Sequence, residues 1–249
     1  IEDISENIVD SDASLMGWFK INDNEGLNPL FGFRNYPNDY CSLYAVMGEN
    51  SMETMVYGNL QSFIDGPFNL NEWYHVALVF NGSDFKTYLN GVLEGSIETP
   101  SSIFDCPDED LLIGRMELGS PIYLNGGIDD VSLWSVALSQ ENIQSYLSSE
   151  LNGNESDLVG YWNFNDGTGN TLTDQTSNGN NGTINGAIWS TDVPPFRPQT
   201  TAELQTAVDL WVSDNASALA TYGEINTWDV SLITDMSWLF EYKPTFNDD

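Results

Sequence analysis

The stretch EWYHVALVFNGSDFKTYLNGVLEG constrains the fold of this chain more than any other. Its first part, WYHVALVF (73–80), is apolar at both alternating sets of positions, which is typical of a strand buried within a sandwich. Its second part contains Asn90-Gly91, a strong signal for a two-residue β-hairpin, because both central residues need a positive φ. LLIGRM (111–116) and GIDDVSLW (127–134) continue the pattern. Short strands separated by Gly, Asn and Pro predict an all-β sandwich or jelly roll.

Helices are predicted in two places. Ser139 precedes QENIQSYLSSEL as a helix cap, with Ile143 on the apolar face. The segment STDVPPFRPQT (190–200) has three prolines and no apolar periodicity, so we interpret it as a linker or a domain seam. Beyond it, TAELQTAVDLWVSD predicts a helix by the spacing of its apolar residues. The apolar positions of the following segment predict that Trp228, Met236 and Phe240 pack inward.

The charge balance excludes several classes of partner. The 249 residues include six Lys plus Arg and 38 Asp plus Glu, a formal net charge of −32 spread along the chain. Binding to phosphate backbones requires clustered cations, so nucleic acid and anionic membrane are excluded as partners. No apolar run is long enough to span a membrane. Such acidity instead favours solubility at high ionic strength and the binding of divalent cations.

Four motifs, in order, resemble a known family. WYHVALVF, YLNGVLEG, LLIGR and GGIDDVSLWSVALSQENI are similar to the laminin-G-like, concanavalin-type jelly roll of secreted proteins. The resemblance covers roughly residues 14 to 190 and implies a concanavalin-like jelly-roll sandwich. TWDVSLITDMSWLF resembles the first BspA-like leucine-rich repeat of surface proteins. One repeat cannot bury its own face, so we expect a truncated array.

The order of the motifs departs from the family in one respect. The segment YWNFNDGTGN…DQTSNGNNG (161–182) comes last here, whereas relatives usually carry it near the start. Either it completes the sandwich or it starts a second jelly roll. We favour completion, because the Pro-rich seam follows directly. The expected organisation is a jelly roll over 1–190 that 158–190 completes, a linker over 191–200, and a helix with a truncated BspA-like repeat over 201–249.

An enzyme is not expected. Glycoside hydrolases of this shape carry paired carboxylates at E-x-D-x-x-E spacing on one strand, and Gly126 stands where the first Glu would be needed. His75 is the only histidine, and it lies in a buried strand without a recognisable nucleophile. A core histidine that donates a hydrogen bond to a backbone carbonyl is the favoured interpretation. Catalytic residues are therefore predicted to be absent.

Two classes of function remain. The resemblance implies a lectin-like recognition or adhesion module for glycans or extracellular proteins, located outside the cell or at its surface. Tyr36, Tyr40 and Tyr44 are the candidate ligand-binding aromatics, because sugar stacking needs an exposed ring beside polar groups. The alternative for these tyrosines is to cover the edge of the core. The alternative function is a structural subunit of a filament or coat, which would self-assemble through a sheet edge left open by a missing first strand.

The cysteines and the Asn-X-Ser/Thr patterns agree with secretion. Cys41 and Cys106 have no CxxC spacing and no nearby histidine, so zinc lacks ligands and a disulfide is predicted. Four possible N-glycosylation sites are present, at Asn81, Asn154, Asn181 and Asn215. The chain starts at Ile1, without a signal peptide, and we interpret it as a mature or excised piece of something longer.

The Asn- and Gly-rich segment over 163–187 predicts a structural calcium site. Calcium takes oxygen ligands, and its loops need glycine. Asp174 offers a carboxylate, Asn178 and Asn180 offer amide carbonyls, and the glycines among them allow a positive φ. The resemblance implies that the matching stretch in relatives binds calcium, often with an aspartate that corresponds to Asp129 or Asp130. The alternative is a loop whose Asn and Asp side chains cap its own turns.

Overall fold

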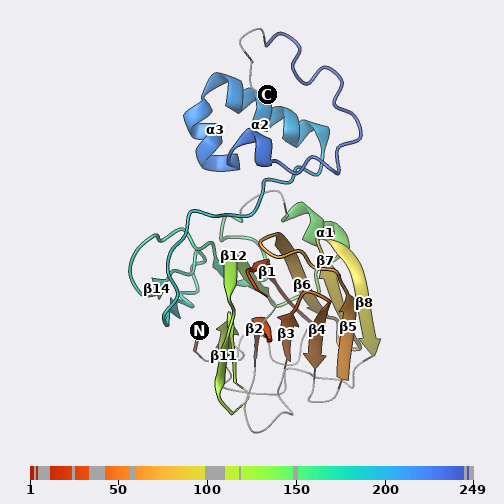
Figure 1. Cartoon of the computed structure of the whole chain (residues 1–249), viewed down its shortest axis with the longest axis vertical. Coiled ribbons are helices and arrows are strands. Elements are labelled where there is room, and N and C mark those ends of the chain that lie inside the picture. Colours follow the sequence, from red (N-terminus) through yellow and green to blue (C-terminus); the bar gives the residue numbers. More distant parts are fainter. Residues whose placement is uncertain are drawn as a thin grey trace.

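Two antiparallel sheets form the body of the molecule (Figure 1). The computed structural model describes residues 1–2, 4, 12–23, 26–33, 43–56, 60–98, 110–117, 119–147, 151–243 and 246. Within these residues, one sheet has the strand order β13-β12-β1-β6-β7-β8 and the other has the order β5-β4-β3-β2-β9. The all-β sandwich with a small C-terminal helical segment, predicted from the sequence, is confirmed.

The elements have the following bounds. The six-stranded sheet consists of β13 (Leu158–Trp162), β12 (Gly126–Trp134), β1 (Ala13–Ile21), β6 (Trp73–Phe80), β7 (Asp84–Leu89) and β8 (Val92–Glu98). The five-stranded sheet consists of β5 (Leu60–Asp65), β4 (Ser51–Val56), β3 (Leu43–Met47), β2 (Asn28–Phe33) and β9 (Leu111–Ile113). Two small hairpins pair β10 (Arg115–Glu117) with β11 (Pro121–Tyr123), and β14 (Thr171–Leu172) with β15 (Gly182–Thr183). The helices are α1 (Gln140–Ser145), α2 (Thr201–Ser213), α3 (Asn215–Tyr222) and the 3-10 turn η3 (Ile225–Thr227).

The main core lies between the two sheets. In β1, Leu15 pairs in register with Leu78 of β6 on one side and with Leu133 of β12 on the other, and all three are buried. Phe19 of β1 meets Phe31 of β2 edge to face, with ring centroids 4.8 Å apart. Alternate positions of every central strand therefore contribute to one apolar layer, as expected for a sandwich.

The predicted Asn-Gly hairpin is confirmed. Asn90 has φ 49° and Gly91 has φ 76°, and these two residues join β7 to β8. The Asn90 side chain also accepts a hydrogen bond from the backbone N–H of His75 at 2.9 Å. The turn thus sets the register of β7 and β8 and at the same time holds the start of β6.

Each sheet has a cover on its outer face. Helix α1 and the residues around it pack on the outer face of the six-stranded sheet, where Tyr146 stacks on Trp134 with centroids 5.0 Å apart. Ser139 accepts a hydrogen bond from the Asn142 N–H, so the predicted helix cap is confirmed. On the five-stranded sheet, the β10–β11 hairpin places Met116 against Tyr44, in a small apolar cluster of its own.

The C-terminal unit consists of α2, α3 and the turns after them, above the sandwich in Figure 1. The predicted helix at 201 is confirmed, with the expected apolar positions Leu204, Ala207, Val208 and Trp211 buried. Trp228 is buried against Trp211, also as predicted. No helix in the described part of the chain is long and apolar enough to cross a membrane.

The prediction that Met236 and Phe240 pack inward is wrong. Both are 43% exposed, whereas Ile233 and Leu239 on the same segment are buried. Helix α3 accounts for the difference, because its Ala218 is fully buried in the same cluster as Trp228 and α2. The small core of the unit is therefore filled by other residues, and Met236 and Phe240 remain partly exposed at its edge. The BspA-like repeat stays a prediction.

Candidate functional site

The Asn/Gly-rich segment lies against the outer edge of β13. Strand β13 ends the six-stranded sheet, so one side of its backbone has no strand partner in that sheet. The Asp174 carboxylate accepts the Tyr161 N–H of β13 at 3.1 Å, together with the N–H groups of Thr176 and Asn180 and the Thr176 hydroxyl. Asp174 is 6% exposed. This carboxylate therefore joins three points of the chain by hydrogen bonds.

Asn178 and Asn180 contact the same strand edge. The Asn178 amide donates to the carbonyls of Leu158 and Val159, and the Asn180 amide donates to the Val159 carbonyl at 2.8 Å. The backbone N–H of Gln175 adds a hydrogen bond to the Tyr161 carbonyl at 2.8 Å. The segment thus forms hydrogen bonds with the outer edge of β13, as a neighbouring strand would. It covers an edge that could otherwise pair with another chain.

The predicted calcium ligands are brought together only in part. Asp174, Asn178 and Asn180 converge on β13, as the preceding contacts show. Asp129 and Asp130 lie in β12, where the Asp130 carboxylate accepts the Tyr161 hydroxyl at 2.5 Å and the Asp129 carboxylate accepts the Asp130 N–H. In the described ranges, no group of three or more His, Cys, Asp or Glu side chains is placed to hold a metal ion.

A small pocket lies on the outer face of the six-stranded sheet. It has a volume of about 10 Å³, room for about one water molecule. Its lining consists of Met16, Trp18, His75, Asp130, Ser132, Tyr146, Leu151 and Tyr161. The pocket mixes aromatic and polar groups.

His75 is the most perturbed group of this pocket. It is 2% exposed, and its ring meets Trp18 edge to face at 5.3 Å. Burial, with a smaller contribution from the Arg197 charge, lowers the His75 pKa to about 3. Nδ1 has no hydrogen-bond partner among the described residues, so the predicted burial is confirmed while the predicted bond to a carbonyl is not found at this atom. His75 is held neutral, in the manner of a core residue.

The linker is fastened to the same face beside the pocket. The Asp192 carboxylate forms an ion pair with Lys20 of β1 and accepts the Trp73 indole N–H at 3.2 Å. Lys20 also lies over the Trp73 ring, with Nζ 5.0 Å from the centroid. Gly127 leaves room for this arrangement, since a Cβ there would lie 2.6 Å from the Trp73 ring. We call Asp192, Lys20 and Trp73 the linker latch.

The β10–β11 hairpin presents an exposed aromatic ring that the sequence analysis missed. Tyr123 is 56% exposed and pairs across the hairpin with Arg115, whose guanidinium lies 6.0 Å from the ring centroid. Arg115 also forms an ion pair with Glu117, and each of these two side chains is 34% exposed. Met116 and Ile122 point the other way, toward the sheet. We call Arg115, Glu117 and Tyr123 the hairpin platform.

An alternation in the sequence could have revealed the platform. Arg-Met-Glu and Pro-Ile-Tyr each place one apolar residue between two that face away from it, which is the pattern of a half-buried hairpin. The strands are only three residues long. Patterns this short are easily overlooked beside the long buried strands.

The three tyrosines predicted to bind ligand are placed differently. Tyr44 is 8% exposed, and its hydroxyl donates to Met55 Sδ at 2.8 Å. A sugar could stack on its ring only if the covering hairpin moved, so this role stays a prediction. Tyr36 and Tyr40 lie outside the described residues, as do Cys41 and Cys106 of the predicted disulfide.

The four predicted glycosylation sites all lie in the described part of the chain. Asn154 and Asn215 are exposed, and so is Asn181, whose side-chain Oδ1 accepts the Asp174 N–H at 2.9 Å. Asn81 is half-buried and accepts the Asp84 N–H at 2.8 Å within its own turn. Glycosylation of these residues stays a prediction.

Two solved structures are similar to this chain, and the first of them supports the fold. A candidate carbohydrate-binding protein from Bacteroides ovatus ATCC 8483 aligns at a TM-score of 0.57 and 17% identity, over 72% of this chain and 56% of that one. The chain thus spans about half the length of that relative. A sialidase carbohydrate-binding domain, CBM40 of Ruminococcus gnavus, aligns at a TM-score of 0.46 and 16% identity, over 57% of this chain and 84% of that one.

Comparison at the level of sequence gives two results. A search of curated proteins finds no match. The family model of the concanavalin A-like lectin/glucanases superfamily, in its laminin-G form, matches residues 3–144, which is more than half of the 249 residues. The strand order, the two stacked sheets and this match lead to the same conclusion: the chain belongs to the concanavalin A-like lectin/glucanases superfamily.

Proposed function

We propose that this chain is a non-catalytic, extracellular carbohydrate-binding module that holds a glycan on the hairpin platform. The observation that carries the proposal is the exposed ring of Tyr123 beside the Arg115–Glu117 ion pair. A sugar ring has an apolar face that stacks on an aromatic side chain and hydroxyl groups that exchange hydrogen bonds with polar neighbours. The platform offers the ring, the donors of a guanidinium and the acceptors of a carboxylate within one small surface.

Arg115 has N–H donors beyond the one at Nη2 that bonds Glu117. Its Nε is buried and has no hydrogen-bond partner among the described residues, although the guanidinium is paired with Glu117. Unpaired buried donors are uncommon, because they carry a desolvation cost. The Bacteroides ovatus structure is described as that of a candidate carbohydrate-binding protein, which agrees with the proposal at the level of the fold.

Replacing Tyr123 by alanine is expected to weaken glycan binding without unfolding the protein. Loss of stacking and of buried apolar area costs about 1–2 kcal/mol, which raises Kd roughly 5- to 30-fold. A glycan array identifies the best ligand, and calorimetric titration then compares its Kd for wild type and variant. Tyr242→Ala is the matched control, because Tyr242 is 91% exposed on the C-terminal unit. Equal losses in both variants, or none in Tyr123→Ala, would contradict the platform.

Calcium binding by the Asn/Gly segment is a separate proposal. It is supported by the convergence of Asp174, Asn178 and Asn180 on one strand edge. The ion would have to replace some of the four hydrogen bonds that Asp174 already accepts, and its role would be to stabilise the segment. Added calcium is then expected to raise the melting temperature and a chelator to lower it, with magnesium as the control ion. A melting temperature that neither addition moves would reject the proposal.

Self-assembly through a sheet edge concerns the opposite end of the six-stranded sheet. Strand β8 is the last strand there, with Val92 50% exposed and Leu93 42% exposed. Glu94 and Glu98 also lie on it and are exposed. Charged residues on an edge strand discourage pairing with a like-charged copy. Assembly through a sheet edge stays a prediction, and this distribution of charge does not favour β8 as that edge.

A further inference from the structure

We propose that the glycan held by the hairpin platform is an uncharged one, whose rings carry hydroxyl groups and no carboxylate, sulfate or phosphate. The inference rests on the proposed function and names the class of ligand. It follows from how the few cations of this chain are used. Four of the five cationic side chains in the described ranges are engaged in ion pairs: Lys20 with Asp192, Arg115 with Glu117, Arg197 with Asp229, and Lys243 with Asp209.

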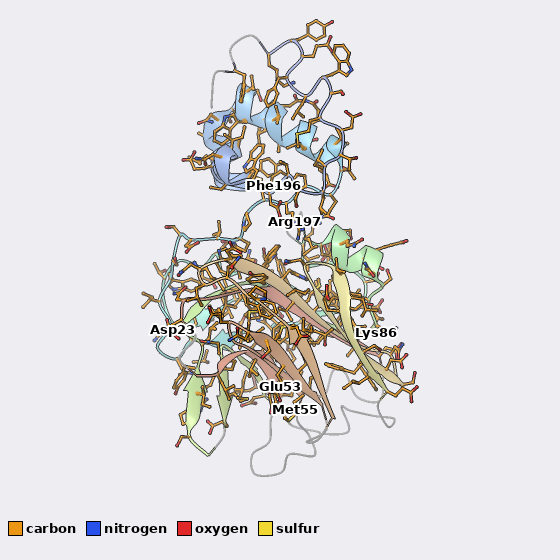
Figure 2. All side chains as sticks on the ribbon, turned by 45° about the vertical axis from the view of Figure 1, so that its right-hand side comes forward. Asp23, Glu53, Met55, Lys86, Phe196 and Arg197 are labelled. Atoms are coloured by element: carbon orange, nitrogen blue, oxygen red, sulfur yellow. The ribbon has the colours of Figure 1, made fainter. Side chains whose placement is uncertain are left out.

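The fifth described cation is remote from the platform. Lys86 lies in β7 of the six-stranded sheet, whereas the hairpin covers the outer face of the five-stranded sheet. Figure 2 shows Lys86 on the side of the molecule formed by β7 and β8. Anionic groups are bound most strongly by charge-assisted hydrogen bonds, which Arg and Lys side chains commonly supply. Arg115 is the one described cation at the platform, and Glu117 already neutralises it.

Glu53 adds a carboxylate to the face of the five-stranded sheet that the hairpin covers. Glu53 and Met55 occupy alternate positions of β4, and Met55 packs into the apolar cluster beneath the hairpin, so Glu53 faces the same side (Figure 2). The whole chain carries 38 acidic residues against six basic ones. Charges within a Debye length, ~8 Å at physiological ionic strength, act on a ligand at the surface. An anionic glycan is repelled there, and a neutral glycan is not.

The ion pair itself suits hydroxyl groups. A hydroxyl both donates and accepts, so two neighbouring hydroxyls on one ring can accept from the guanidinium and donate to the Glu117 carboxylate. A sugar carboxylate only accepts, and beside Glu117 it would meet a second acceptor of the same charge. The donors and acceptors of the platform therefore complement those of two neighbouring hydroxyl groups, and they do not complement a carboxylate.

The test compares neutral sugars with uronates, and the glucose and galactose oligomers differ from their uronate counterparts only at C6, where a carboxylate replaces the hydroxymethyl group. Neutral oligomers of glucose, galactose, mannose and xylose are titrated beside oligomers of glucuronate and galacturonate. Each titration is done at about 0.05 and about 0.5 M NaCl, where the Debye length is ~14 and ~4 Å. We expect a neutral oligomer to bind at least about tenfold more tightly than its uronate counterpart at low salt. The difference in affinity between the neutral and the uronate oligomer should become smaller at high salt, because screening weakens the repulsion of the uronate.

A substitution at the ion pair sharpens the test. Glu117→Gln frees the Arg115 charge and is expected to shift the ratio of the two Kd values at least about fivefold toward the uronate. Glu98→Gln makes the same change of charge on the distant strand β8 and should leave the ratio nearly unchanged. Uronate binding that equals neutral binding and is lost in Tyr123→Ala would overturn this inference and leave glycan binding intact. If no sugar of either class binds at either salt concentration, the proposed function is rejected together with the inference.

Discussion

Lowering the pH from 7 to 5 is expected to reduce the free energy of unfolding by about 2 kcal/mol through His75 alone. Burial, followed by the Arg197 charge, lowers the His75 pKa from 6.5 to about 3 in the folded protein. The unfolded chain therefore binds a proton as the pH falls through 6.5, while the folded protein stays neutral at His75. Stability from this group is fully present above pH 6.5, declines below it, and has fallen by roughly 4 kcal/mol once the pH reaches the folded pKa.

The measurement is urea unfolding at pH 7, 6 and 5. His75 is the only histidine of the chain, so the interval above pH 5 isolates its titration from that of most of the acidic groups. His75→Gln serves as the control, because glutamine does not titrate and retains hydrogen-bonding groups. The variant is expected to lose stability at pH 7 but to show a much flatter dependence on pH. Parallel pH profiles for the two proteins would show that His75 is not the buried neutral group described here.

Replacing Asp174 by alanine is expected to destabilise the sandwich by about 3–5 kcal/mol. The substitution removes an acceptor of four hydrogen bonds and leaves the Tyr161 N–H, on the edge of β13, without its partner. Hydrogen bonds to a charged group and buried donors left unpaired each contribute about 1–3 kcal/mol. Asp174→Asn, which keeps one acceptor oxygen, should lose about half as much.

Thermal and urea unfolding measure the loss, and hydrogen exchange at the Tyr161 amide locates it. Asp166→Ala is the matched control in the same segment, since Asp166 is exposed and accepts the Thr173 N–H at 2.9 Å. Its cost is expected to be about 1 kcal/mol or less. Comparable losses for Asp166 and Asp174 would mean that the segment does not stabilise β13 through Asp174.

The long strands and their turn were predictable from local signals. WYHVALVF is apolar on both faces, and Asn90-Gly91 is a two-residue turn whose backbone angles follow from the residue types. Ser139 and the apolar positions of α2 were equally clear, because capping and helical spacing are properties of a few neighbouring residues. These features depend on short-range physics, which a sequence displays directly.

The candidate site depended on contacts that a sequence does not display. A run with Asp174, Asn178 and Asn180 among glycines has the composition both of a calcium loop and of a loop that caps a strand edge, since each needs oxygen atoms and tight turns. The contact of these residues with β13 becomes visible only when the fold brings 158–162 and 174–180 together. The prediction for Met236 and Phe240 failed for a similar reason. Helix α3 contributes to the core of the C-terminal unit, in the place where these two residues were expected to pack.

The linker latch has a mechanical consequence. Figure 2 shows Phe196 and Arg197 between the sandwich and the C-terminal helices, so the chain passes from one unit to the other just beyond Asp192. A pull on the C-terminal unit reaches Asp192 before it reaches residues 163–190. The ion pair with Lys20 delivers this load to β1, a strand with neighbours on both sides in the six-stranded sheet. The Asn/Gly-rich segment on β13 therefore carries less of the load. Without the linker latch, its hydrogen bonds with β13 would break in succession.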